Sequence, residues 1–174
     1  AEHGTDSCTL LVTTSRALAE ATQVELERQI ALLPQVRAEA ARSSLGVNGG
    51  CVIVGSLDEA ADVANEFAPE HLQLVVRREV EDRMVSRIQH AGEILLGQHT
   101  PFSAANFLIG CPASLPTNNF ARVSSGVTVE AFLKRTAVAR ADNDALRAMS
   151  TSITVLADVE GFPAHANAIR LRFP

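Results

Sequence analysis

Short apolar runs alternate with longer amphipathic segments along the first 96 residues of the chain. The apolar runs predict four strands, at residues 9–13, 51–54, 72–76 and 93–96. Between them, apolar residues recur at helical spacing and predict helices at residues 15–33, 56–67 and 80–91, and Pro34 can begin a further helix that ends near residue 46. Alternation of strands and helices is typical of an α/β layer with a largely parallel sheet. We therefore expect residues 1–97 to form an α/β domain, an incomplete Rossmann-like parallel layer.

Local signals define the bounds of the third predicted helix. Ser56-Leu57-Asp58-Glu59 has the S-x-x-E spacing of a capping box, which begins a helix. Ala68-Pro69 ends the same helix, because proline disfavours helical geometry in the residue before it. Glu70-His71 then falls at the junction between this helix and the next strand.

The alternating pattern stops after residue 97. Residues 97–127 are rich in Gly, Pro, Ser and Asn and show no clear period, which is typical of a functional loop or a crossover between domains. A short helix is predicted over residues 128–134, and apolar residues from Leu146 to Leu156 share one face of a longer helix. We expect a crossover and site-loop segment over 98–140 and a helical C-terminal dimer tail over 141–174.

Composition excludes several classes of protein. Hydrophobic residues make up 47% of the chain and charged residues 20%, which is typical of a globular protein. A net charge of -5, with no Trp or Tyr, disfavours nucleic acid as a partner. No apolar run approaches the roughly 20 residues that span a membrane. The three distant cysteines predict free thiols and a cytoplasmic protein. Because the first residue is Ala1, we interpret the chain as a fragment or a trimmed product.

Glu70-His71 is the strongest candidate for chemistry on the residues alone. The chain lacks the GxGxxG, Walker, GxSxG and HExxH motifs. A lone histidine is usually an ordinary surface residue, so His90 and His99 are given no role. His71 differs because it follows a carboxylate at a helix-to-strand junction. Imidazole titrates near neutrality and suits proton abstraction from an alcohol, and glutamate can activate a water.

The segment from Pro69 to Leu74, PEHLQL, resembles the PEHL-x-L signature of histidinol dehydrogenases. Further segments resemble motifs of the same family, in the same order and at compatible spacing. They are Ala1-Glu2-His3, Gly92 to Gly97 with Thr100-Pro101, Leu115-Pro116-Thr117, Ala121 to Gly126, Phe132 to Arg135, and Glu160 to His165. The resemblance covers essentially the whole chain, which corresponds to the C-terminal portion of the family's proteins.

The resemblance implies NAD-dependent, zinc-containing oxidation of L-histidinol to L-histidine through a bound aldehyde, the last steps of histidine biosynthesis. His71 would be the general base, and Glu70 would activate the water that attacks the aldehyde. The implied zinc ligands are His3, Asn106 and His165, and histidine nitrogens suit this metal. The implied substrate contacts are His3, His71, Asn106, Glu160 and His165.

The resemblance also implies a homodimer whose C-terminal segment completes the partner's site, so that His165 would serve the other subunit. The family's NAD site lies mostly before the position of Ala1, and no residue here is assigned to it.

Departures from the family pattern leave alternatives open. The family's glutamine ligand would precede Ala1, and Asn106 stands where the family has an aspartate ligand. Ala113 stands where the family has a histidine that helps to hold the substrate. One alternative is a divergent paralogue that oxidises another small alcohol or polyol. The other is an inactive truncated chain that serves only in dimerisation or interaction.

Overall fold

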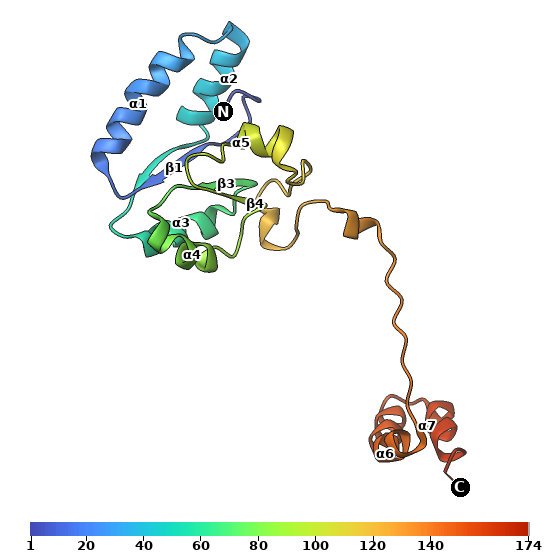
Figure 1. Cartoon of the computed structure of the whole chain (residues 1–174). Helices are drawn as coiled ribbons and strands as arrows, with labels where there is room; N and C mark the ends of the chain where they lie inside the picture. Colours follow the sequence, from blue (N-terminus) through green and yellow to red (C-terminus); the bar gives the residue numbers. More distant parts are fainter. Residues whose placement is uncertain (174) are drawn as a thin grey trace. The chain divides into compact units, whose positions relative to one another are not determined.

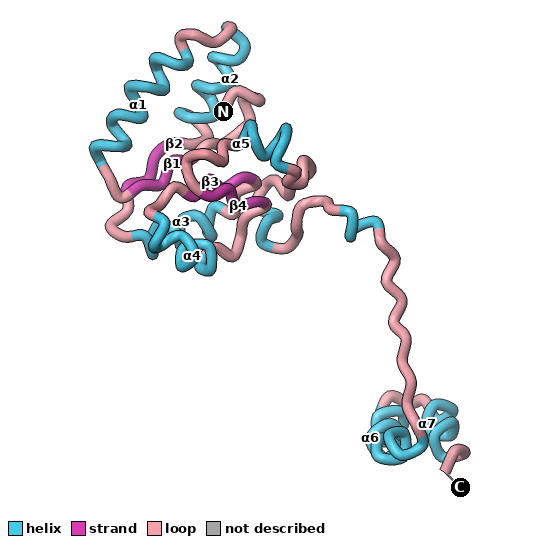
Figure 2. Tube along the Cα trace, viewed as in Figure 1, coloured by secondary structure: helices cyan, strands magenta, loops and turns pink. Residues whose placement is uncertain are grey.

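The computed structural model describes residues 1–173. These residues form two units, the first from Ala1 to Phe132 and the second beginning at Leu133. Figures 1 and 2 show the course of the chain through each unit. Within residues 1–173, no helix is both long enough and apolar enough to cross a membrane.

Four short strands form the centre of the first unit. They are β1 (Leu10–Thr13), β2 (Gly50–Ile53), β3 (His71–Leu74) and β4 (Glu93–Leu96). β1 pairs with β2 and β3 pairs with β4, and both pairs are parallel. The predicted α/β class with parallel pairing is confirmed, although the strands form two separate pairs in place of one continuous sheet.

Helices connect and cover these strands. They are α1 (Arg16–Ile30), α2 (Gln35–Gly46), α3 (Leu57–Phe67) and α4 (Arg78–Arg87). Figure 1 shows α1 and α2 on one side of the strands and α3 and α4 on the other. α1 contacts both strands of the first pair, and α3 contacts β1 and α4. Each parallel pair is thus joined by a helical crossover, as parallel strands require.

The bounds of α3 follow the predicted signals. The Ser56 hydroxyl accepts from the Glu59 N–H at 3.1 Å, and the Glu59 carboxylate accepts from the Gly55 N–H at 2.8 Å. The predicted cap is therefore confirmed, with the carboxylate reaching one residue further back than in the standard box. Ala68 ends the helix in the left-handed region, at φ 49°, and turns the chain toward β3.

The prediction for α4 was wrong at its end. The helix stops at Arg87, and Ile88 is extended, whereas the apolar pattern predicted a helix to residue 91. The side-chain oxygen of Asn65, on α3, accepts hydrogen bonds from the N–H groups of Gln89 and His90 at 2.7 and 3.2 Å. These bonds give the two donors a partner outside the helix, so the chain leaves α4 and returns to the sheet.

A small apolar core holds the second strand pair against its helices. Ala61 of α3, Leu74 of β3 and Met84 of α4 are buried together. Partly buried side chains, including Leu57 of α3 and Ile94 of β4, pack around them. This core fixes β3 and β4, and with them the residues at the start of each strand.

Residues 97–132 form a series of short turns. The segment contains α5 (Phe102–Ala104), the π-helical turn η1 (Ala105–Ile109), and the 3-10 turns η2 (Phe120–Arg122) and η3 (Val129–Phe132). The predicted lack of regular structure over 97–127 is confirmed. The helix predicted at 128–134 is only the turn η3. Arg122 donates to the Glu66 carbonyl at 2.5 Å and so attaches η2 to α3.

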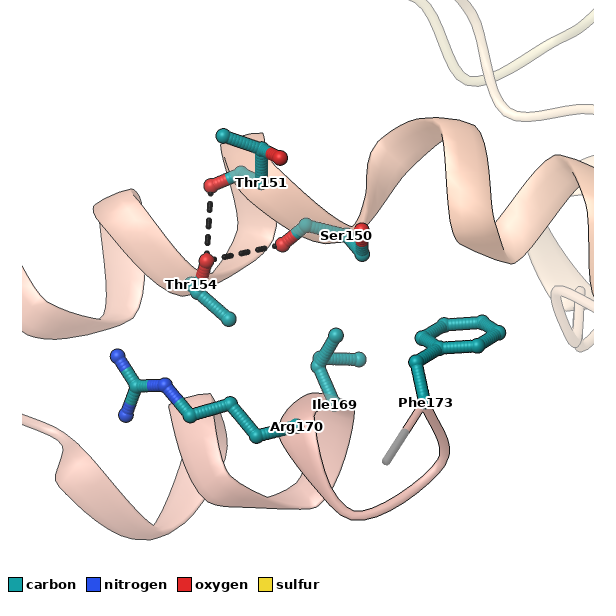
Figure 3. A pocket seen from close by; sticks show the side chains of 6 residues that line it. All are labelled: Ser150, Thr151, Thr154, Ile169, Arg170 and Phe173. Atoms are coloured by element: carbon teal, nitrogen blue, oxygen red, sulfur yellow. Dashed lines mark hydrogen bonds between the residues drawn. The ribbon is translucent and has the colours of Figure 1, made fainter.

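Two helices form the core of the second unit. α6 (Asn143–Val159) contains the predicted apolar face, and α7 (Pro163–Arg170) was not predicted as a separate helix. Gly161, at φ 75°, separates the two, and Arg170 pairs with Asp158 at 2.6 Å. Figure 3 shows a hollow between them, lined by Ser150, Thr151, Thr154, Ile169, Arg170 and Phe173.

Candidate active site

His71 stands at the first position of β3, directly opposite Glu93, the first residue of β4. Its Nδ1 lies 2.5 Å from Glu93 Oε1, and its Nε2 lies 3.5 Å from Glu70 Oε1. The structure thus brings together the predicted Glu70-His71 pair and adds a second carboxylate. The imidazole therefore lies between two acids, hydrogen-bonded to Glu93 through Nδ1 and with Glu70 near its Nε2.

The backbone at the start of the two strands sets this geometry. The Gly92 N–H donates to the Pro69 carbonyl at 2.9 Å, and the Glu93 N–H donates to the Glu70 carbonyl at 3.0 Å. A Cβ on Gly92 would lie 2.5 Å from the Glu70 carbonyl oxygen, closer than real Cβ atoms approach. Only glycine allows the backbone segments that lead into β3 and β4 to come this near, so Gly92 is part of the framework of the site.

Exposure increases across the three side chains. The side chain of Glu93 is 6% exposed, that of His71 is 24% exposed and that of Glu70 is 38% exposed. The ring of Phe102 covers His71 from one side, with 5.5 Å between ring centroids. The imidazole therefore has a buried acid behind it and a solvent-facing acid beside it.

Cys111 lies next to the buried acid. Partial burial raises the pKa of the Cys111 thiol above its ordinary value, and the neighbouring Glu93 carboxylate raises this pKa further. The thiol is therefore held in its neutral, protonated form at physiological pH.

The predicted metal residues of the first unit are both exposed. His3 lies in the N-terminal segment, where its carbonyl accepts from Arg37 at 3.3 Å. Asn106 lies in η1, on the turn that follows Phe102. Because Phe102 contacts His71, the segment carrying Asn106 adjoins the Glu70-His71 pair.

The remaining predicted site residues lie in the second unit. Glu160 is exposed at the C-cap of α6. His165 is exposed on α7, with its ring 5.2 Å from that of Phe162. Among residues 1–173, no three His, Cys, Asp or Glu side chains gather in an arrangement that could hold a metal ion.

Glu93 was missed as a candidate at the sequence level. The resemblance does not define it, because the matching family motif, A-G-x-I-F-L-G, leaves this position variable. One signal was available: Glu93 is a charged residue at the head of an otherwise apolar run, Ile94-Leu95-Leu96. A charge within a buried strand usually has a partner, but the sequence does not say which residue that is.

A comparison with protein families matches the model described as histidinol dehydrogenase over residues 1–173. The chain belongs to the histidinol dehydrogenase family. The predicted resemblance is therefore confirmed.

Relatives in this family show the same extent of similarity. The chain is 45% identical over 172 residues to the histidinol dehydrogenase of Synechocystis sp. and 39% identical over 173 residues to that of Bacillus cereus. The crystal structure of histidinol dehydrogenase from Elizabethkingia anophelis matches with a TM-score of 0.90 and 30% identity. In all three cases the match covers 99% of this chain and 39% of the relative.

Proposed function

We propose that this chain is part of an enzyme that oxidises L-histidinol to L-histidine, in two NAD-dependent steps through a bound aldehyde. The observation that carries the proposal is the His71 imidazole held between two carboxylates, in a chain of the histidinol dehydrogenase family. Such a reaction belongs to the last steps of histidine biosynthesis. We infer a cytoplasmic homodimer in which the C-terminal segment completes the partner's site.

His71 is the proposed base for the first oxidation. Its Nδ1 is engaged by Glu93, so Nε2 is the nitrogen that takes the proton of the substrate hydroxyl. NAD, when bound, would accept the hydride from the substrate carbon that carries this hydroxyl. No residue of this chain is assigned to NAD.

Glu70 is the proposed base for the second oxidation. Its side chain is 38% exposed, so it can contact both water and a substrate near His71. The carboxylate takes a proton from the water whose oxygen attacks the aldehyde carbon. The two proton transfers are thus divided between the imidazole of His71 and the carboxylate of Glu70.

Zinc is proposed to bind His3 and Asn106 of one subunit together with the His165 that the other subunit contributes. All three side chains are exposed and therefore open to a metal ion. Imidazole nitrogens fit zinc, and the amide oxygen of Asn106 can serve as a ligand. Because that amide is neutral where the family has a carboxylate, we expect zinc to be held more weakly here. When bound, zinc would polarise and orient the substrate oxygen. Glu160 is proposed to contact the substrate.

A chimera tests the proposal. This chain would replace the matching 39% of the Synechocystis sp. relative, and NADH formation would be measured with L-histidinol, with and without added zinc. We expect zinc-dependent turnover that falls by about 10²-fold or more in His71→Asn, the size of a general-base contribution. His99→Asn, a change at an exposed loop histidine, should leave turnover unchanged. A folded chimera that binds NAD and does not oxidise histidinol would contradict the proposal.

Oxidation of another small alcohol or polyol is the second candidate. Asn106 and Ala113 favour it, since both replace polar or charged family residues that contact the metal or the substrate. A buried polar group that loses its partner can change substrate discrimination strongly. In a panel of alcohols, turnover confined to histidinol would exclude this candidate. Restoration of histidinol turnover only by Asn106→Asp with Ala113→His would support it.

A non-catalytic role as a dimerisation or interaction module is the remaining alternative. It predicts no NADH formation from the chimera with any alcohol of the panel. NADH formation abolished by His71→Asn would exclude it.

A further inference from the structure

We propose that Glu93 is a positioning residue for His71, which holds the neutral ring with its proton on Nδ1 and so leaves Nε2 free as the base. The catalytic consequence rests on the proposed function, whereas the state of the ring does not. Glu93 is not one of the residues that the family motif defines, so the pairing is argued from the geometry of this chain.

Strand register places the two side chains together. His71 and Glu93 are directly opposite each other at the start of β3 and β4. Residues opposite each other on paired strands have side chains on the same face and interact directly. The distance of 2.5 Å from Nδ1 to Oε1 is a hydrogen bond. An ionised carboxylate only accepts, so with Glu93 ionised Nδ1 carries the proton of this hydrogen bond.

Burial makes the bond to His71 important for Glu93. The Glu93 side chain is 6% exposed, and an isolated buried carboxylate is strongly destabilised. Within residues 1–173, its second oxygen, Oε2, has no hydrogen-bond partner. His71 is thus the partner of this carboxylate that can carry a charge, and the neutral Cys111 thiol lies beside it. Removal of either member of the His71–Glu93 pair would leave the other without this partner.

Glu70 is poorly suited to the same task. Its Oε1 lies 3.5 Å from Nε2, beyond the usual hydrogen-bond range, and its side chain is 38% exposed. A partner on Nε2 would also occupy the nitrogen that the reaction needs. The two carboxylates therefore have different roles: Glu93 orients the ring from its buried side, and Glu70 faces the solvent.

Nitrogen-15 NMR of the imidazole rings tests the proposal on this chain itself. Long-range proton–nitrogen correlations distinguish Nδ1–H from Nε2–H, and His71→Asn identifies the signals of His71. Spectra would be recorded on the basic plateau of the titration, where the ring is neutral. We expect Nδ1–H in the wild-type chain and conversion to Nε2–H, the form that neutral imidazole favours in water, in Glu93→Met.

Four matched variants separate positioning from general effects on the fold. Glu93→Met keeps the side-chain volume and removes the buried charge, a change that proteins often tolerate well. Glu93→Asp keeps a carboxylate and should retain Nδ1–H. Glu70→Gln and Cys111→Ala change neighbours of the pair and should also retain it. Amide spectra of each variant would show that the fold is kept.

Activity of the chimera gives the second readout. We expect Glu93→Met to lower kcat by about 10²-fold while KM changes by less than about threefold, because the ring loses its orientation and not its substrate. Glu93→Asp should restore part of kcat. A ring with Nε2–H in the wild-type chain, or one that stays Nδ1–H in Glu93→Met, would overturn the proposal. A chimera without turnover but with the expected tautomers would contradict only the proposed function.

Discussion

Replacement of Gly92 by alanine should separate the starts of β3 and β4 and disturb the site. The added Cβ would lie 2.5 Å from the Glu70 carbonyl oxygen and 3.1 Å from Cδ of Pro116. To reach even the closest approach of 3.0 Å that real Cβ atoms show, the carbonyl must move by about 0.5 Å. That carbonyl is backbone, and the chain directly before it is held by the buried residues Ala68 and Pro69.

The energetic effect follows from the two hydrogen bonds at this point. Movement of the carbonyl weakens the bond from the Glu93 N–H, at 3.0 Å, and the bond from the Gly92 N–H to Pro69, at 2.9 Å. A buried donor or acceptor left without its partner costs about 1–3 kcal/mol. We therefore expect Gly92→Ala to lower the free energy of unfolding by about 2–4 kcal/mol. The His71–Glu93 bond should also lengthen, because both residues adjoin the displaced backbone.

Urea denaturation of the two proteins measures this effect. Gly46→Ala is the matched control, since it makes the same chemical change at the end of α2, where nothing lies within 4 Å of the new Cβ. In a helix, alanine is more favourable than glycine by up to about 1 kcal/mol, so the control should be neutral or stabilising. Equal stability of Gly92→Ala and the wild-type chain, with an unchanged His71 tautomer, would refute the reasoning.

Three further predictions concern the packing of the core, a helix cap and the environment of a thiol. Met84→Ala removes a side chain that is 2% exposed in the core of α3, α4 and β3. We expect it to lower the free energy of unfolding, measured by urea denaturation, by about 2–5 kcal/mol. A loss below about 1 kcal/mol would contradict the assigned core. Ser56→Ala removes the cap of α3 and should cost about 1 kcal/mol, whereas Ser56→Gly should cost only a few tenths. The pKa of the Cys111 thiol is raised above the ordinary thiol value of 9.0, so less of this thiol is ionised at any pH below 9.0. Because the thiolate is the reactive form, iodoacetamide should modify Cys111 more slowly than the exposed Cys8 and Cys51 in this pH range. Peptide mass spectrometry measures all three rates, and equal rates would contradict the raised pKa.

Local sequence signals sufficed for most of the elements. The apolar periodicity located α1, α3 and α6, since each depends mainly on contacts between residues three or four apart, and Pro34 marked the start of α2. The Ser56 cap and Pro69 defined the two ends of α3 for the same reason. The end of α4 could not be read in this way, because it depends on the Asn65 side chain of another helix. α7 was missed because its separation from α6 depends on the reversal of the chain at Gly161, at φ 75°.

The candidate site was predictable only in part. Glu70 and His71 are adjacent in the sequence, so their proximity required no knowledge of the fold. Glu93 is 22 residues from His71, and only the parallel register of β3 and β4 makes them partners. Strand register depends on which faces are buried and on the length of the connection, and neither is a local property. The roles proposed for His3, Asn106, Glu160 and His165 remain predictions from the family resemblance.

By itself, the sequence determined the α/β class, the family and the adjacent Glu70-His71 pair, because these depend on periodicity and on contiguous motifs. Only the tertiary structure decided that the imidazole has a buried carboxylate on its other nitrogen. The reason is physical: burial and the close approach of β3 and β4 at Gly92 are properties of packed strands. A sequence shows that Glu93 is charged, and the fold decides what that charge contacts.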